Sequence, residues 1–217
     1  MMVIRDVRSS VKRLLIPGIC MFVLLLSSCT QQPLPQKPTP TPSLPIVFDF
    51  VFVLPASTKQ PPSITADELN TIFSANNSPA RDEGTDFVTI GMQERIHPVF
   101  LAALFRATSQ FATKGLQGIS AAQLHTLTFA PSRTGGVYEA YASWKDGIQA
   151  AARLLYDLYY KQEGYGTVRQ LVPVFFPSSN GWNDTCILTS LLQAISVWMH
   201  GMYSYKFAFM KCSPSMS

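Results

Sequence analysis

The sequence predicts an all-α domain that follows an N-terminal signal peptide and a proline-rich linker. Three observations support this fold class. After residue 64, apolar residues recur at spacings of three and four, which is the period of an α-helix. Several of these apolar runs begin at a serine, threonine or asparagine of the kind that caps a helix N-terminus. No convincing alternation of apolar and polar residues, as half-buried strands require, occurs after residue 64.

Residues 1–28 have the pattern of a bacterial lipoprotein signal peptide. An apolar stretch over residues 14–26 is too short to span a bilayer and suits the core of a signal peptide. It ends in Leu-Ser-Ser-Cys at residues 26–29, the lipobox order of an aliphatic residue, two small residues and cysteine. We therefore expect lipidation at Cys29, with the mature chain outside the cytoplasm and anchored to a membrane. The alternative is an uncleaved membrane anchor in which Cys29 is incidental. Positive charge precedes the stretch at Arg5, Arg8, Lys12 and Arg13.

The net charge of +4 comes mostly from this signal peptide. Removing residues 1–28 takes away four of 17 basic and one of 13 acidic residues, which leaves 13 against 12 and a net charge of +1. A chain so close to neutral lacks the basic surface that nucleic acids require. We therefore expect no nucleic-acid partner.

Residues 29–63 read as a linker, because prolines at this density block helices and favour an extended, solvated chain. One apolar run over residues 46–54 interrupts it. That run fits either a strand or an extended segment that docks on the domain, and the sequence does not decide between them.

The predicted domain covers residues 64–200. Thr65 and Glu68 form a capping box for its first helix, which ends near Asn77. A second short helix is expected around residues 86–94, and a third begins at Pro98, a favoured first-turn residue. Residues 112–142, rich in glycine, read as a long irregular loop.

The second half of the domain has its own helix signals. Ser143, with Asp146 three residues later, caps the longest helix, which ends at Gly164. Thr167 begins a short helix, and Asn183 or Asp184 caps the last one. Residues 201–217 form a tail without a clear pattern.

Only two cysteines remain for the mature domain, because Cys20 leaves with the signal and Cys29 is the predicted lipidation site. Cys186 and Cys212 can pair outside the cytoplasm, but we favour a buried free thiol at Cys186. Two cysteines make no metal site, so the sequence predicts neither a metal nor a cofactor.

Several short segments, taken in order, resemble the lysozyme-like glucosaminidase family (mannosyl-glycoprotein endo-β-N-acetylglucosaminidase-like domains). This family cleaves the glycan of bacterial cell walls. The resemblance covers roughly residues 64–199 and implies a lysozyme-like helical fold and a peptidoglycan or related glycan partner. It rests on these segments: Ile64-Thr65-Ala66, Asn77-Ser78-Pro79, residues 97–105, residues 109–115, residues 141–148, Thr167-Val168 with Pro173 and Pro177, and Asn183-Asp184.

The resemblance fails at the residue on which the family's chemistry depends. Family members place a catalytic glutamate at the end of the third helix, in the pattern Glu-Ser-x-Phe-Gly-Thr-x-Gly. Residues 108–115 match it except that Thr108 replaces the glutamate and Ala112 replaces the first glycine. Glycoside cleavage needs a carboxylic acid to protonate the departing oxygen, and a threonine hydroxyl does not release its proton near neutral pH. The expected domain binds sugar but scarcely cuts it.

Three other carboxylates are possible substitutes for the missing acid. Glu94 lies four residues before Pro98, at the far end of the third helix from Thr108, and Asp146 is explained as a cap partner. Glu139, in the loop, is the one rescue candidate, although most loop glutamates are simply solvated.

The resemblance implies that Ser109, Phe111, Tyr138 and Tyr141 line the sugar-binding site. Tyr138 and Tyr141 fit sugar contact and packing equally well, whereas Trp144 at a helix start is expected in the core. Ser109 has no visible His–Asp relay for serine-hydrolase chemistry. His97 and His125 have no partners at ligand spacing and are expected at the surface.

Three functional hypotheses follow. The first is a degenerate glucosaminidase-like domain that binds cell-wall glycan with little or no hydrolysis. The second is an active peptidoglycan hydrolase that uses a displaced carboxylate such as Glu139. The third is a structural envelope lipoprotein without glycan binding.

Overall fold

The computed structural model describes residues 49–56, 64–116, 119–128, 139–177, 183–205 and 212. Within these residues the protein is all-α, which confirms the predicted fold class. The elements are α1 (Ala66–Ala75), α2 (Gly84–Gln93), α3 (Pro98–Ser109), β1 (Gly115–Leu116), β2 (Ile119–Ser120), α4 (Ala121–Leu124), α5 (Trp144–Arg153), the π-helix η1 (Leu154–Gln162), α6 (Val168–Phe175) and α7 (Asp184–Met199).

Local caps place the helices where the sequence predicts them. Thr65 and Glu68 form a complete capping box at α1, and the Ser143 hydroxyl accepts the Asp146 amide at α5. Asn183 rather than Asp184 is the N-cap of α7. These side chains satisfy N–H groups that a helix leaves unpaired at its first turn.

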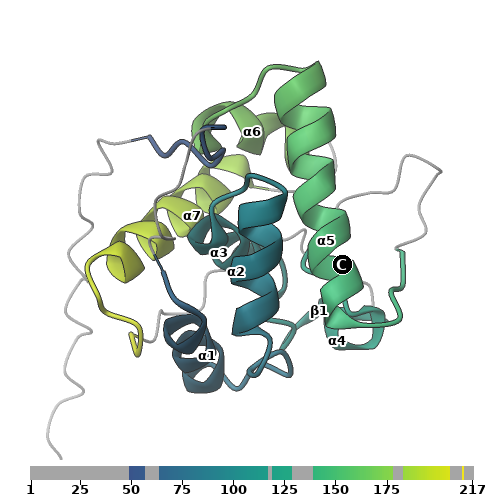
Figure 1. Cartoon of the computed structure of the whole chain (residues 1–217), viewed down its shortest axis with the longest axis vertical. Helices are drawn as coiled ribbons and strands as arrows, with labels where there is room; N and C mark the ends of the chain where they lie inside the picture. Colours follow the sequence, from purple (N-terminus) through teal and green to yellow (C-terminus); the bar gives the residue numbers. More distant parts are fainter. Residues whose placement is uncertain are drawn as a thin grey trace, which may run out of the picture. The chain divides into compact units, whose positions relative to one another are not determined.

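The core is built around α3, whose side chains are buried on nearly every side. This helix packs against α7 and α2, and α2 also packs against α1 and α5 (Figure 1). Aromatic rings fill the space between these helices, with edge and tilted contacts at centroid distances of 4.8–6.1 Å. The cluster consists of Phe73, Phe87, Phe105, Phe111, Trp144 and Trp198.

Residues 49–54, here called the docking segment, are extended and pack on the domain. Val53 pairs with Ile96 and Val51 pairs with Thr167 through isolated bridges. Phe52 is fully buried, and its ring stacks on that of Phe100 at 4.8 Å. The apolar run was expected to be either a strand or a docked extended segment, and residues 49–54 form a docked segment. These residues of the predicted linker therefore belong to the packed domain.

His97 joins the docking segment to the start of α3. Its backbone N–H donates to the Phe52 carbonyl, and its ring contacts that of Phe50 edge-on at 5.2 Å. Burial lowers the pKa of His97 below its ordinary value, since the charged imidazolium loses hydration there. The expectation that His97 lies at the surface is therefore wrong.

Two further expectations need correction. Cys186 and Cys212 form a disulfide, so Cys186 is not a free thiol. The stretch expected as one irregular loop contains β1, which pairs antiparallel with β2, and the short helix α4. Elements of only two to four residues are too short for apolar periodicity to reveal them. In the part of the chain described here, no helix is long and apolar enough to cross a membrane.

Candidate functional site

Thr108, at the position of the family's glutamate, lies in the last turn of α3. It is buried, and its Oγ1 lies 2.9 Å from the Leu104 carbonyl oxygen and 2.7 Å from the Leu127 carbonyl oxygen. A hydroxyl has one proton, so it donates to one of these carbonyls at a time. The side chain therefore fastens the end of α3 to the segment that follows α4.

The backbone after α3 turns through an unusual conformation. Gln110, Phe111 and Ala112 have φ values of 50°, 57° and 62°, and none of them is glycine. A left-handed non-glycine residue costs on the order of 1–2 kcal/mol, so three in succession require support from their surroundings. Ser109 Oγ accepts the Ala112 N–H at 3.0 Å, and Ser78 Oγ donates to the Phe111 carbonyl at 3.0 Å.

Ser109 and Phe111, both expected to bind sugar, lie in the interior. Ser109 is 1% exposed, and its hydroxyl donates to the Phe105 carbonyl. Phe111 is 1% exposed within the aromatic cluster. Neither reaches a sugar in this arrangement, and both instead hold the left-handed turn in place. In this chain, the two residues are therefore explained by backbone geometry and packing.

Of the two predicted aromatic residues that the structure describes, Phe111 is buried and Tyr141 is partly exposed. Its hydroxyl donates to Glu139 Oε2 at 2.9 Å, and its backbone N–H donates to the Leu124 carbonyl. Burial, and then the neighbouring Glu139 carboxylate, raise the pKa of Tyr141 to about 12. Tyr141 is therefore neutral at physiological pH and presents a partly exposed ring beside an exposed carboxylate.

His125 contacts both Tyr141 and Trp144. Its Nδ1 lies 2.8 Å from the Tyr141 carbonyl oxygen, which only accepts, so Nδ1 carries a proton. The ring also contacts Trp144 edge-on at 5.5 Å. Glycine at position 147 lets α5 lie close to the His125 backbone, because a Cβ at that position would lie 1.8 Å from the His125 carbonyl oxygen. His125 is half-buried, so its expected surface position is wrong.

Two predicted residues lie outside the described part of the chain. These are Tyr138, the second candidate aromatic, and Cys29, the predicted lipidation site. Trp144 is in the core, as expected. The Ser143 hydroxyl, which accepts the Asp146 N–H, also lies 2.7 Å from the Asp146 carboxylate, consistent with the predicted cap role.

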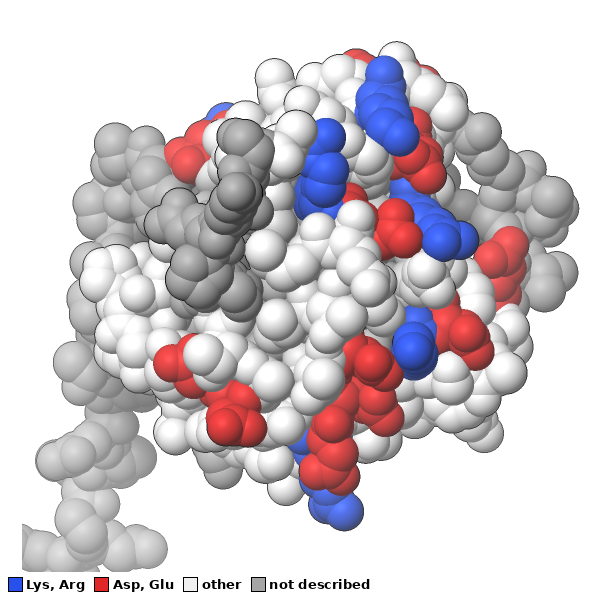
Figure 2. All heavy atoms as spheres, in the orientation of Figure 1, with Lys and Arg blue, Asp and Glu red and all other residues white. Residues whose placement is uncertain are grey.

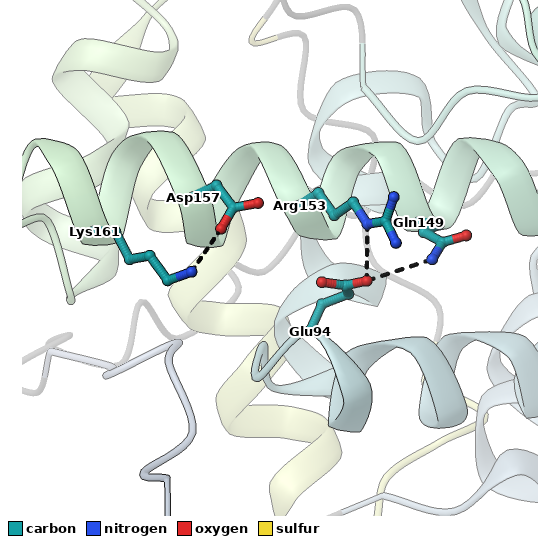
Figure 3. A network of polar contacts seen from close by, with 5 residues as sticks. All are labelled: Glu94, Gln149, Arg153, Asp157 and Lys161. Carbon is teal, nitrogen blue, oxygen red and sulfur yellow. Dashed lines mark hydrogen bonds and ion pairs between the residues drawn. The ribbon is translucent and has the colours of Figure 1, made fainter.

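Glu94 serves a structural purpose at the C-terminal end of α2. Figure 3 shows its carboxylate between Arg153 and Gln149 of α5, at 3.0 Å and 3.4 Å respectively. One turn further along, Lys161 pairs with Asp157 at 2.9 Å. The Glu94 contacts join α2 to α5 and explain Glu94 without any catalytic role, whereas the Lys161–Asp157 pair lies within η1.

Glu83, at the N-cap of α2, is a carboxylate that the sequence reasoning missed. Burial raises its pKa, and the negative charge of Asp86 and a hydrogen bond with it raise the pKa further. It lies within electrostatic range of His125, whose opposite influence is smaller. No sequence signal marks Glu83, because the largest cause of its raised pKa is burial, which depends on how the folded chain packs around it.

Among the described residues, no group of three or more histidine, cysteine, aspartate or glutamate side chains has an arrangement able to hold a metal ion. A comparison with protein-family models finds no match for this chain, and a comparison with curated proteins finds none either.

Proposed function

We propose that the protein is a membrane-anchored envelope lipoprotein whose helical domain binds peptidoglycan or a related glycan with little or no hydrolysis. The observation that carries this proposal is the hydrogen bonding of Thr108. Its hydroxyl is engaged with the carbonyls of Leu104 and Leu127, and a hydroxyl cannot replace a general acid there. The disulfide supports an oxidising location outside the cytoplasm.

Glycan binding is assigned to the exposed side of Tyr141. Sugar rings stack on aromatic faces, and the adjacent Glu139 carboxylate can accept hydrogen bonds from sugar hydroxyls. Basic and acidic side chains are interspersed on the face shown in Figure 2, with wide uncharged areas between them. Binding through stacking and hydrogen bonds should therefore depend little on salt concentration.

A pull-down of the purified protein on insoluble peptidoglycan tests this proposal. Tyr141→Ala should reduce the bound fraction at least several-fold, whereas Tyr141→Phe, which keeps the ring, should retain most binding. Tyr165→Ala is a matched control, because Tyr165 is a partly exposed tyrosine elsewhere. Absence of binding by the native protein would favour the structural lipoprotein.

The second candidate function is an active peptidoglycan hydrolase with a displaced acid. Glu83 is a candidate acid because burial and the nearby Asp86 raise its pKa, which is the direction that a general acid requires. Glu139, the rescue candidate from the sequence, is exposed and bonded to Tyr141. Release of reducing ends from peptidoglycan by the native protein, lost in Glu83→Gln or in Glu139→Gln, would establish this function and identify the acid.

A further inference from the structure

The disulfide between Cys186 and Cys212 closes the C-terminal part of the chain onto the start of α7. The two residues are separated by 26 positions. Asn183 belongs to the same arrangement, since its side chain caps the Cys186 N–H at 2.9 Å and its backbone N–H donates to the Cys212 carbonyl at 3.2 Å. The disulfide therefore joins the first turn of α7 to Cys212.

The environments of the two sulfurs differ. Cys186 is partly exposed and lies in the first turn of the 16-residue helix α7, whereas Cys212 is 3% exposed. Unpaired N–H groups and the helix dipole favour negative charge at a helix N-terminus, and helical side chains lean toward that end. Cys186 is therefore the more exposed of the two cysteines, and it lies at a helix end that favours negative charge.

We propose that this pair is an oxidation site for an extracytoplasmic dithiol–disulfide exchange protein, with Cys186 as the attacking thiol and Cys212 as the resolving thiol. The Cys186 thiolate attacks one sulfur of the partner's disulfide. A bond forms between them, and the partner's other sulfur leaves as a thiolate that takes a proton from water. Cys212, after losing its proton, attacks Cys186 and releases the partner as a dithiol.

The electrons balance in this sequence. Two cysteine thiols of the protein are oxidised to one disulfide, and one disulfide of the partner is reduced to two thiols. This inference rests on the extracytoplasmic location in the proposed function, but not on its glycan binding.

Single-cysteine variants of the full chain test the assigned order. In a Cys20→Ser, Cys29→Ser background, either Cys186→Ser or Cys212→Ser leaves one thiol. The probe is glutathione disulfide, and mass spectrometry follows its adduct. We expect the adduct at Cys186 to form at least tenfold faster than the adduct at Cys212. In 8 M urea, which removes the fold, the two rates should converge to within about twofold. Equal rates in the folded protein, or faster reaction at Cys212, would overturn the proposal.

Two further measurements guard against a variant that fails to fold. Limited alkylation of the reduced protein that retains both cysteines should modify Cys186 preferentially, and preference for Cys212 would contradict the assigned order. A dithiol–disulfide oxidoreductase in its oxidised form, with both of its cysteines present, should form a mixed disulfide with the Cys212→Ser variant, and alkylation of the thiol that this reaction frees on the partner traps the adduct. Failure to trap that variant while trapping Cys186→Ser would reverse the two roles.

Discussion

The Thr108 hydroxyl lies 2.7 Å from the Leu127 carbonyl oxygen and links the end of α3 to the segment after α4. This link makes Thr108 a structural residue at the position where the resembled family has its acid. Thr108→Val keeps the shape of the side chain but removes the donor, so we expect a loss of about 1–3 kcal/mol in the free energy of unfolding. Thr108→Ser keeps a hydroxyl donor, so it should retain most of the native free energy of unfolding. Urea denaturation measures both, and an unchanged Thr108→Val variant would show that the link is unimportant.

Thr108→Glu tests whether the site lacks only its acid. A protonated glutamic acid can donate to the Leu127 carbonyl, whereas a charged one would face an acceptor, so the pKa of the new carboxyl should rise. We expect measurable release of reducing ends from peptidoglycan where the native protein gives almost none. The double variant with Ala112→Gly should be more active, because Ala112 has φ 62° and glycine relieves that strain. Thr108→Gln is the control, and equal turnover by this variant would rule out acid catalysis at this position.

Gln110 offers a test of strain at the left-handed turn. It is the C-cap of α3 and has φ 50°, which glycine adopts without steric cost. Gln110→Gly should therefore raise the free energy of unfolding by about 1 kcal/mol. Thr89→Gly, at an exposed position in the interior of α2, is the control and should lower the free energy of unfolding. Destabilisation by both changes would mean that the turn carries no strain.

His97 predicts how the stability depends on pH. Burial lowers its folded-state pKa below the ordinary value of 6.5, so the unfolded chain binds the proton more readily. The contribution of neutral His97 is complete above pH 6.5 and is lost as the pH falls below it toward the lowered pKa. His97→Phe should flatten the dependence of the urea midpoint on pH across this window. An equally steep dependence in His97→Phe would assign the effect to another group.

Phe52 should be the main anchor of the docking segment. Phe52→Ala removes a fully buried ring, and the expected cost is about 3–5 kcal/mol in the free energy of unfolding. Val51→Ala, at a neighbouring position that is 56% exposed, should change it by less than about 0.5 kcal/mol. Comparable effects of the two substitutions would indicate that backbone pairing, rather than the ring, holds the segment.

The sequence predicted what is encoded locally and missed what depends on distant contacts. Caps such as Thr65 with Glu68 are readable because both partners lie within one helical turn. The disulfide between Cys186 and Cys212 joins residues far apart in the chain, and so does the contact between Phe52 and Phe100. The spacing of apolar residues along the sequence does not predict such pairs. At the candidate site, the position of Thr108 at the end of α3 was predictable, but its bond to Leu127 was not.

The burial of Phe52 also determines where tension would enter the folded chain. A pull on the chain from the N-terminal side of residue 49 reaches the docking segment before it reaches α1. Backbone hydrogen bonds hold that segment on two sides, to Arg95 and His97 near α3 and to Gly166 and Val168 near α6. Mechanical load is therefore divided between two helices distant in sequence.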